Sequence, residues 1–269
     1  MNSEVIEANR RVHSSLILSG EYQKSPHRSP ESIRRVQSIL SEINPSKKPL
    51  VHLDVGCGDG FIFECRPKHW VSHGIDATPE MLQACTSNHP DVKLQLGYAE
   101  KLPFKDASFD VVTCYSFLDH LESTGGFYAE AIRVLKPGGI FYFGLNPNRD
   151  FYIALMRVAQ LKLSKILQNQ IDLPLESQKA FDDGHYYEKN FGIDKKDLSL
   201  CEPGKSITKG LSPLEESAKL ESLGIDQIEF KYEWIVQQHR LGADVIKNLI
   251  DFLPFTSACF KYFDLMGTK

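Results

Sequence analysis

The stretch Leu53-Asp54-Val55-Gly56-Cys57-Gly58-Asp59-Gly60-Phe61 follows a short apolar run that is typical of a buried strand. Three of its residues are glycines spaced two apart, so the chain can turn sharply here and bring its backbone close to a ligand. A strand that ends in such a turn and opens into a helix is typical of nucleotide-binding folds. The stretch therefore predicts an α/β protein with a binding site at the end of this strand.

The residues between and after the glycines indicate which ligand fits. A dinucleotide fold needs a glycine where this chain has Phe61, because the helix must approach the strand closely there. Asp54, which precedes the first glycine, would repel a pyrophosphate and attract an ammonium group. The pattern therefore favours S-adenosylmethionine (SAM), whose amino acid end carries an ammonium group, over a nicotinamide or flavin dinucleotide.

Five further motifs follow the glycine loop along the chain. They are His73-Gly74-Ile75-Asp76, Ala99-Glu100-Lys101-Leu102-Pro103-Phe104, Ser108-Phe109-Asp110-Val111-Val112-Thr113, Leu118-Asp119-His120-Leu121 and Arg133-Val134-Leu135-Lys136-Pro137-Gly138-Gly139. In this order and at this spacing, residues from about 50 to 146 resemble the type 11 methyltransferase domain of the class I SAM-dependent methyltransferases. Asp76 stands at the distance beyond the glycines at which a carboxylate accepts hydrogen bonds from a ribose diol.

The pattern of strands alternating with helices predicts a parallel sheet. Its strands are expected near residues 50–55, 71–75, 92–96, 109–114 and 139–145, after helices at 3–19 and 30–43. The resemblance implies a Rossmann-like seven-stranded, mostly parallel sheet with helices on both faces, whose edge is a reversed hairpin formed by 225–235 and 258–266. The predicted organisation is an N-terminal helical lid (1–48), a SAM-binding core (49–146), a substrate-cap insertion after the fifth strand (147–212) and the C-terminal part of the core sheet (213–269).

The resemblance assigns cofactor contacts to residues at the carboxyl ends of these strands, where ligands of such sheets bind. The backbone of Gly56, Cys57 and Gly58 would pass under the methionine part of SAM. Asp54 would help to orient the amino group of the methionine part, and Asp76 would hold the ribose hydroxyls.

The adenine side is assigned in the same way. Ala77 and Met81 would form one wall of the adenine slot, and the peptide at Ala99, next to Glu100, would bond an adenine ring nitrogen. Cys114, just past the fourth strand, would contact the methionine part through its backbone.

Two tyrosines complete the predicted cofactor contacts. The family commonly has an acid where this chain has Tyr98, and a phenol can accept one hydrogen bond or stack on a ring edge but carries no charge. We therefore expect adenine to be held differently from the family pattern. Tyr22 lies in a polar segment between the first two helices, which is either a lid over the cofactor or a plain surface loop.

Methyl transfer from SAM is an in-line displacement, so correct placement of the acceptor does much of the work. A base is needed only when the acceptor must lose a proton. His120 follows the fourth strand, where the family commonly has a histidine on the substrate side, and it is the first candidate base. The alternative is that His120 caps a helix or packs under the sheet. Asp119 beside it is a candidate substrate contact.

The predicted cap contains a long helix over residues 151–171. Its apolar residues are too many for the narrow apolar stripe of an ordinary surface helix. Such a wide apolar face suits a hydrophobic acceptor. An irregular stretch follows, in which His185 is a second candidate base and Tyr186 and Tyr187 are candidate substrate contacts. The alternative is that these three residues pack the cap onto the core.

Composition limits the partners. The chain has 269 residues, a net charge of −4 and no basic patch with interleaved aromatics, so nucleic acid is not expected. Its six cysteines are scattered, no pair has the close spacing of a zinc site, and no metal is expected. We expect no stable membrane insertion and a cytoplasmic location, because neither a signal peptide nor a spanning stretch is recognised.

The sequence therefore predicts a SAM-dependent methyltransferase that yields S-adenosylhomocysteine. We expect an oxygen or nitrogen atom of a small, possibly hydrophobic acceptor to receive the methyl group, with carbon less favoured. One alternative is a methyltransferase that acts on a macromolecule. The other is a regulatory protein that binds SAM or S-adenosylhomocysteine without catalysis.

Overall fold

A computed structural model describes residues 3–43, 48–153, 185–206, 210–233 and 260–269. Its centre is one seven-stranded sheet in the order β3-β2-β1-β4-β5-β7-β6. The strands are β1 (Val51–Val55), β2 (Val71–Asp76), β3 (Lys93–Leu96), β4 (Phe109–Tyr115), β5 (Leu135–Pro147), β6 (Ile228–Glu233) and β7 (Tyr262–Thr268). The first five strands are parallel, whereas β7 runs antiparallel to both β5 and β6. The predicted fold class is confirmed.

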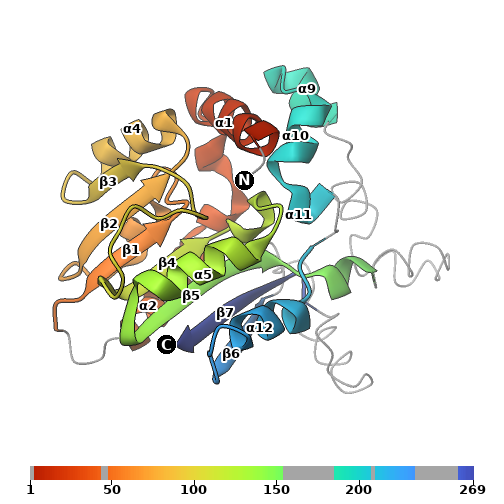
Figure 1. Ribbon diagram of the computed structural model, residues 1–269. Helices are drawn as coiled ribbons and strands as arrows, with labels where there is room; N and C mark the ends of the chain where they lie inside the picture. The colour runs from red at the N-terminus through yellow and green to blue at the C-terminus, as the bar shows by residue number, and fades with distance from the viewer. Residues whose placement is uncertain (1–2, 44–47, 154–184, 207–209, 234–259) are drawn as a thin grey trace.

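Helices cover both faces of this sheet (Figure 1). On one face, α5 (Thr124–Val134) and α12 (Pro213–Glu221) pack into a core that includes Leu53, Phe143 and Leu265. On the other face lie α2 (Pro30–Ile43) and α3 (Phe61–Cys65), with α4 (Pro79–Asn88) beside α3. Because both faces are covered, β1 and β4 are buried almost throughout, including their polar residues His52, Asp54 and Thr113.

A third group of elements lies above the carboxyl ends of β1, β2 and β4 and forms the cover of the molecule. It consists of α1 (Ser3–Leu18), the short helical turns η1 (Tyr22–Lys24) and η2 (Pro26–Arg28), α9 (His185–Phe191), α10 (Lys195–Cys201) and α11 (Pro203–Ser206). Although far apart in sequence, α1 and α10 lie side by side (Figure 1). Their contact buries Val12 against Ile193 and Cys201.

The helices expected at 3–19 and 30–43 correspond to α1 and α2. The fifth strand begins earlier than predicted, at Leu135 rather than 139, because Leu135 already pairs with Phe109 before the register shifts. The expected hairpin strands are observed as the shorter β6 and β7. Most of the predicted cap helix, residues 154–171, lies outside the described residues. Among the described residues, no helix combines the length and apolar character needed to cross a membrane.

Candidate cofactor site

A pocket opens at the carboxyl ends of β1, β2 and β4, beneath α1 and η1. This is the position at which open α/β sheets bind their ligands. The pocket is lined by many of the residues that the sequence assigned to the cofactor or to catalysis, namely Tyr22, Gly56, Gly58, Asp76, Ala77, Met81, Tyr98, Ala99, Glu100 and His120. The structure therefore brings these residues to one place from five segments of the chain.

The glycine loop is held in a fixed shape by its own backbone. The N–H groups of Gly56 and Cys57 both donate to the carbonyl of Ile75, at 2.9 and 3.1 Å. Gly56 has φ +68°, and a Cβ atom there would lie 2.1 Å from the ring of Phe117. Glycine is thus required at position 56 both for its backbone conformation and for the close approach of Phe117.

Asp76 connects the second strand to this loop. Its Oδ2 accepts from the N–H of Gly58 at 2.9 Å, and its Oδ1 accepts from the N–H of Thr78 at 2.8 Å. Burial raises the pKa of this carboxyl group, and the two backbone donors oppose that rise. Asp76 thus braces the loop while it lines the pocket, and its bond to a ribose stays a prediction.

Tyr22 lies close to the loop at Gly58. Its hydroxyl is only 2.9 Å from the position that a Cβ at Gly58 would take. The η2 turn is fastened to the loop by Arg28, whose Nη1 lies 2.6 Å from Oδ1 of Asp59, with the two side chains 13% and 2% exposed. The guanidinium of Arg28 also stands over the rings of Tyr22 and Phe61. In this structure the polar segment packs on the glycine loop, and the Arg28–Asp59 pair was not foreseen from the sequence.

Three predicted cofactor residues lie behind the pocket wall. Asp54 is buried in β1, accepts a 2.6 Å hydrogen bond from Thr113, and has its pKa raised to about 8 by burial. Cys57 packs with Cys85, and Cys114 is buried within β4. Their contacts with the methionine part remain predictions. They would have to reach the ligand through water or the backbone.

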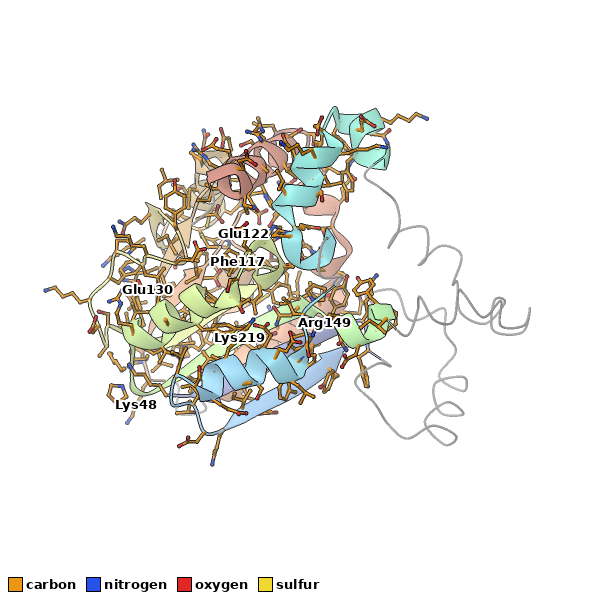
Figure 2. All side chains as sticks on the ribbon, turned by 45° about the vertical axis from the view of Figure 1, so that its right-hand side comes forward. Lys48, Phe117, Glu122, Glu130, Arg149 and Lys219 are labelled. Atoms are coloured by element: carbon orange, nitrogen blue, oxygen red, sulfur yellow. The ribbon has the colours of Figure 1, made fainter. Side chains whose placement is uncertain are left out.

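The end of β4 supplies pocket residues that sequence reasoning missed. Tyr115, Ser116 and Phe117 line the pocket directly after Cys114, and Ser116 has φ +50°, a value that is uncommon outside glycine. Figure 2 shows Phe117 and Glu122 near the end of α5 that faces the cover. Their position after a buried strand was the available signal, because such residues face the ligand edge of the sheet.

The candidate substrate side is polar. His120 lies in η3 (Leu118–His120), with its Nδ1 2.9 Å from the carbonyl of Cys201 and 3.0 Å from Oδ1 of Asn9. Asp119 points away from the pocket into an ion pair with Lys205, 3.1 Å long. Burial alone would raise the pKa of Asp119, but Lys205 and His120 hold it below its usual value. The proposed substrate contact of Asp119 is not seen in this geometry.

The predicted cap residues lie away from this pocket or outside the description. Tyr187 packs against Phe191 and the cluster between α1 and α10. His185 and Tyr186 belong to α9, but their side chains lie outside the described residues, as do residues 154–184. A substrate contact by His185, Tyr186 or Tyr187 therefore remains a prediction.

The comparisons with known proteins agree with this geometry. A family model described as "Methyltransferase domain" matches residues 53–143. A phthiotriol/phenolphthiotriol dimycocerosates methyltransferase from Mycobacterium tuberculosis is 27% identical over 175 residues, which cover 64% of this chain and 65% of the relative. A demethylmenaquinone methyltransferase from Chlorobaculum parvum is 34% identical over 103 residues, or 38% of this chain and 42% of the relative.

A solved SAM-dependent methyltransferase from Thermotoga maritima, described as a possible histamine N-methyltransferase, has the same fold. It superimposes with a TM-score of 0.55 and 17% identity, over 97% of this chain and 99% of that one. The family-model match, the relatives and the shared fold all agree with the resemblance to the class I SAM-dependent methyltransferases, and the predicted resemblance is confirmed. Residues 53–143 thus match the methyltransferase domain that the sequence motifs resemble.

Proposed function

We propose that this chain binds SAM in the described pocket and transfers its methyl group to a small-molecule acceptor. The observation that carries the proposal is the preformed glycine loop, braced by Asp76 and facing an open pocket. Methyl transfer then requires an acceptor atom in line with the methyl–sulfur bond, which the pocket would achieve by placement.

The lining of the pocket supports a partly apolar acceptor with an oxygen or nitrogen nucleophile. Val5, Ile6 and Leu121 give one part of the wall an apolar character, whereas Asn9 and His120 provide hydrogen-bonding groups. Two relatives have names that refer to dimycocerosates and to demethylmenaquinone, both with large apolar parts, which supports a hydrophobic acceptor here as well.

Calorimetric titration with S-adenosylhomocysteine tests the cofactor site before any acceptor is known. We expect micromolar binding by the native chain and a loss of about tenfold or more in Asp76→Asn. Both carboxylate oxygens of Asp76 accept from backbone N–H groups, and asparagine has only one acceptor oxygen, so its NH2 group would face an N–H donor. Asp106→Asn is the matched control, since Asp106 is an exposed partner of Arg133 remote from the pocket. Absence of binding by the native chain would contradict the proposal.

Turnover distinguishes the enzyme from a protein that only binds the cofactor. Purified chain is incubated with methyl-labelled SAM and a panel of quinols, phenols, alcohols and amines, and label in the organic phase is counted. Labelled product that disappears in Asp76→Asn supports the enzyme. Tight S-adenosylhomocysteine binding with no labelled product from any class would favour the non-catalytic alternative.

A further inference from the structure

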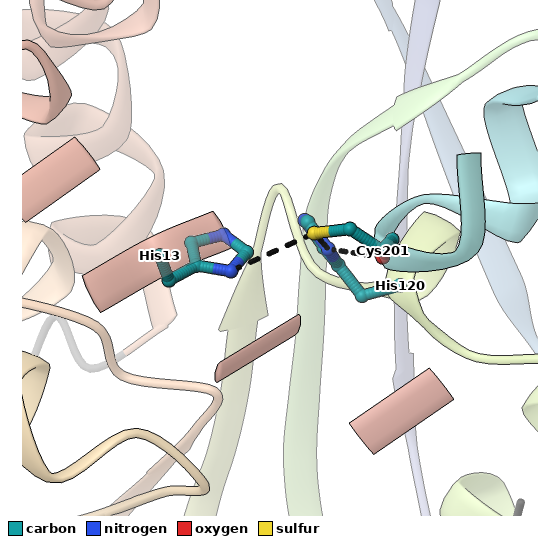
Figure 3. Close-up of side chains that lie close together, drawn as sticks. All are labelled: His13, His120 and Cys201. Atoms are coloured by element: carbon teal, nitrogen blue, oxygen red, sulfur yellow. Dashed lines mark hydrogen bonds between the residues drawn. The ribbon is translucent and has the colours of Figure 1, made fainter. Parts of the chain in front are cut away.

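Three metal-ligating side chains meet where the cover rests on the pocket. His13 comes from α1, His120 from η3 and Cys201 from the end of α10 (Figure 3). One nitrogen of each imidazole and the sulfur of Cys201 all lie within 4.8 Å of one another. No close pair of ligands in the sequence indicates this cluster, because its members are separated by 81 and 188 positions.

The distances suit a single small ion. Sγ of Cys201 lies 3.7 Å from Nδ1 of His13 and 3.8 Å from Nδ1 of His120. Zinc bonds of about 2.3 Å to sulfur and about 2.05 Å to nitrogen place these atoms roughly 3.6 Å apart in a tetrahedron. The two sulfur–nitrogen distances are thus within a few tenths of an ångström of those in a zinc site, and the two imidazole nitrogens, which lie within 4.8 Å of each other, need to come to about 3.3 Å.

Asn9 supplies a fourth donor in the same space. Its Oδ1 lies 3.0 Å from Nδ1 of His120 and 3.5 Å from Sγ of Cys201. The amide nitrogen of Asn9 donates to the carbonyl of Val5 at 3.0 Å, which turns the oxygen toward the cluster. Such an outer hydrogen bond is the usual means of orienting a metal ligand.

The neighbouring carboxylates do not compete for the ion. Asp119 and Glu202 form a second acidic group around His120, but both are already paired with Nζ of Lys205 at 3.1 Å. A thiolate with two imidazoles is a donor set that suits zinc and excludes magnesium and calcium, which prefer oxygen.

We propose that His13, His120 and Cys201, with Asn9 as the fourth donor, form a zinc site. Each Nδ1 now lies 2.9 Å from a backbone carbonyl, of Asn9 and of Cys201, so zinc binding would release the Nδ1 protons, break these hydrogen bonds and turn both rings toward Sγ. The ion joins α1 to η3 and α10, and so fixes the cover over the pocket. Because it occupies a nitrogen of His120, this residue is a ligand rather than a base in the zinc-bound protein.

Cobalt titration of the metal-free full chain, without SAM or its product, tests the site. We expect one equivalent of Co²⁺ to bind with thiolate-to-cobalt charge-transfer absorption and four-coordinate ligand-field bands, and one equivalent of Zn²⁺ to abolish both. Cys201→Ser should lose the charge-transfer band. Cys65→Ser is the matched control, because Cys65 is a buried cysteine of α3 outside the cluster and should leave the band unchanged.

A second variant guards against misfolding of Cys201→Ser. In His13→Ala, zinc affinity measured by competition with a chelating dye should fall at least about tenfold while the thermal melt of the metal-free chain remains cooperative. A native chain that shows no charge-transfer band, or a band that survives in Cys201→Ser, would overturn the zinc site. Neither result bears on S-adenosylhomocysteine binding, which is measured separately.

Discussion

The two sides of the cofactor pocket are built in different ways. On the sheet side, backbone groups hold the loop in place. The N–H of Gly58 donates to Asp76, which is only 18 positions away. On the cover side, attachment depends on side chains from distant segments. Examples are Arg28 with Asp59, and Arg11 with Asp197, which are 186 positions apart.

This difference teaches where the protein can be changed without losing its fold. The loop of the sheet side is part of the core, so a change there alters both stability and ligand binding. The cover is attached through a few ion pairs between side chains, and each pair can be removed by a separate substitution. Local opening of such weakly fastened elements is the usual route by which ligands enter a covered site.

The largest effect is expected from Gly56→Ala. A left-handed conformation costs an L-residue about 1–2 kcal/mol, and the collision with Phe117 adds about 1–3 kcal/mol. We expect the free energy of unfolding, measured with urea, to fall by the sum of these two terms. Binding of S-adenosylhomocysteine, measured by calorimetry, should be lost as well. Gly138→Ala is the matched control, because Gly138 has φ +74° with nothing within 4 Å of an added Cβ. Equal losses in both variants would mean that Phe117 moves aside freely.

The next effect concerns the fastening of the cover. Arg28→Met leaves the buried carboxylate of Asp59 without its partner, which should cost about 3 kcal/mol. Arg28→Met combined with Asp59→Asn should recover much of that stability, while binding of S-adenosylhomocysteine stays weaker than native because the η2 turn is no longer tied to the loop. Thermal melts and calorimetry on the four members of the cycle measure both effects. A double variant with native binding would show that the fastening does not serve the pocket.

Asp54, on the sheet side of the pocket, makes the stability of the folded chain depend on pH. Burial raises its pKa from 3.8 to about 8, so between these values the folded chain holds a proton that the unfolded chain has lost. Stability therefore falls as pH rises through this window, by at most about 1.4 kcal/mol per pH unit from this group. The neutral variant Asp54→Asn should gain stability relative to the native chain from pH 4 to 8. Parallel pH profiles of the two chains would argue against a protonated Asp54.

The smallest effect is expected on the outer edge of the cover. Arg11 holds Asp197 with two hydrogen bonds of 2.7 and 2.6 Å, but its side chain is 56% exposed. Arg11→Gln should lower the melting temperature slightly at low salt and not at all at high salt, since solvent and ions screen such pairs. A lower melting temperature that persists at high salt would indicate that Arg11 stabilises the α1–α10 contact by something other than its charge.

The same contrast separates what the sequence could predict from what it could not. The glycine loop, the position of Asp76 at the end of a strand and the positions of the first five strands follow from local patterns, because a turn and the strand before it are close in sequence. The sequence could not predict whether the side chains of Asp54 and Cys114 face the pocket. When a strand is buried on both faces, its pattern does not show which face a residue is on.

The cover could not be derived in that way. The pairing of Arg28 with Asp59 and the meeting of His13 with Cys201 depend on how distant helices dock, which no periodicity encodes. Asp119 illustrates the same limit: its neighbour in space is Lys205, and this ion pair, not the pocket, decides where the carboxylate points. Residue types alone therefore did not predict which side chains meet in the cover.

The strand order at the edge of the sheet has a consequence for the order of folding. In the described sheet β6 is hydrogen-bonded to β7 alone, and β7 is inserted between β6 and β5. During synthesis, β6 therefore emerges before the only strand that can hold it, and the edge of β5 waits unpaired in the meantime. An exposed strand edge invites pairing with other chains. The interval before residues 262–268 dock is thus the time at which the edges of β5 and β6 are open to pairing with other chains.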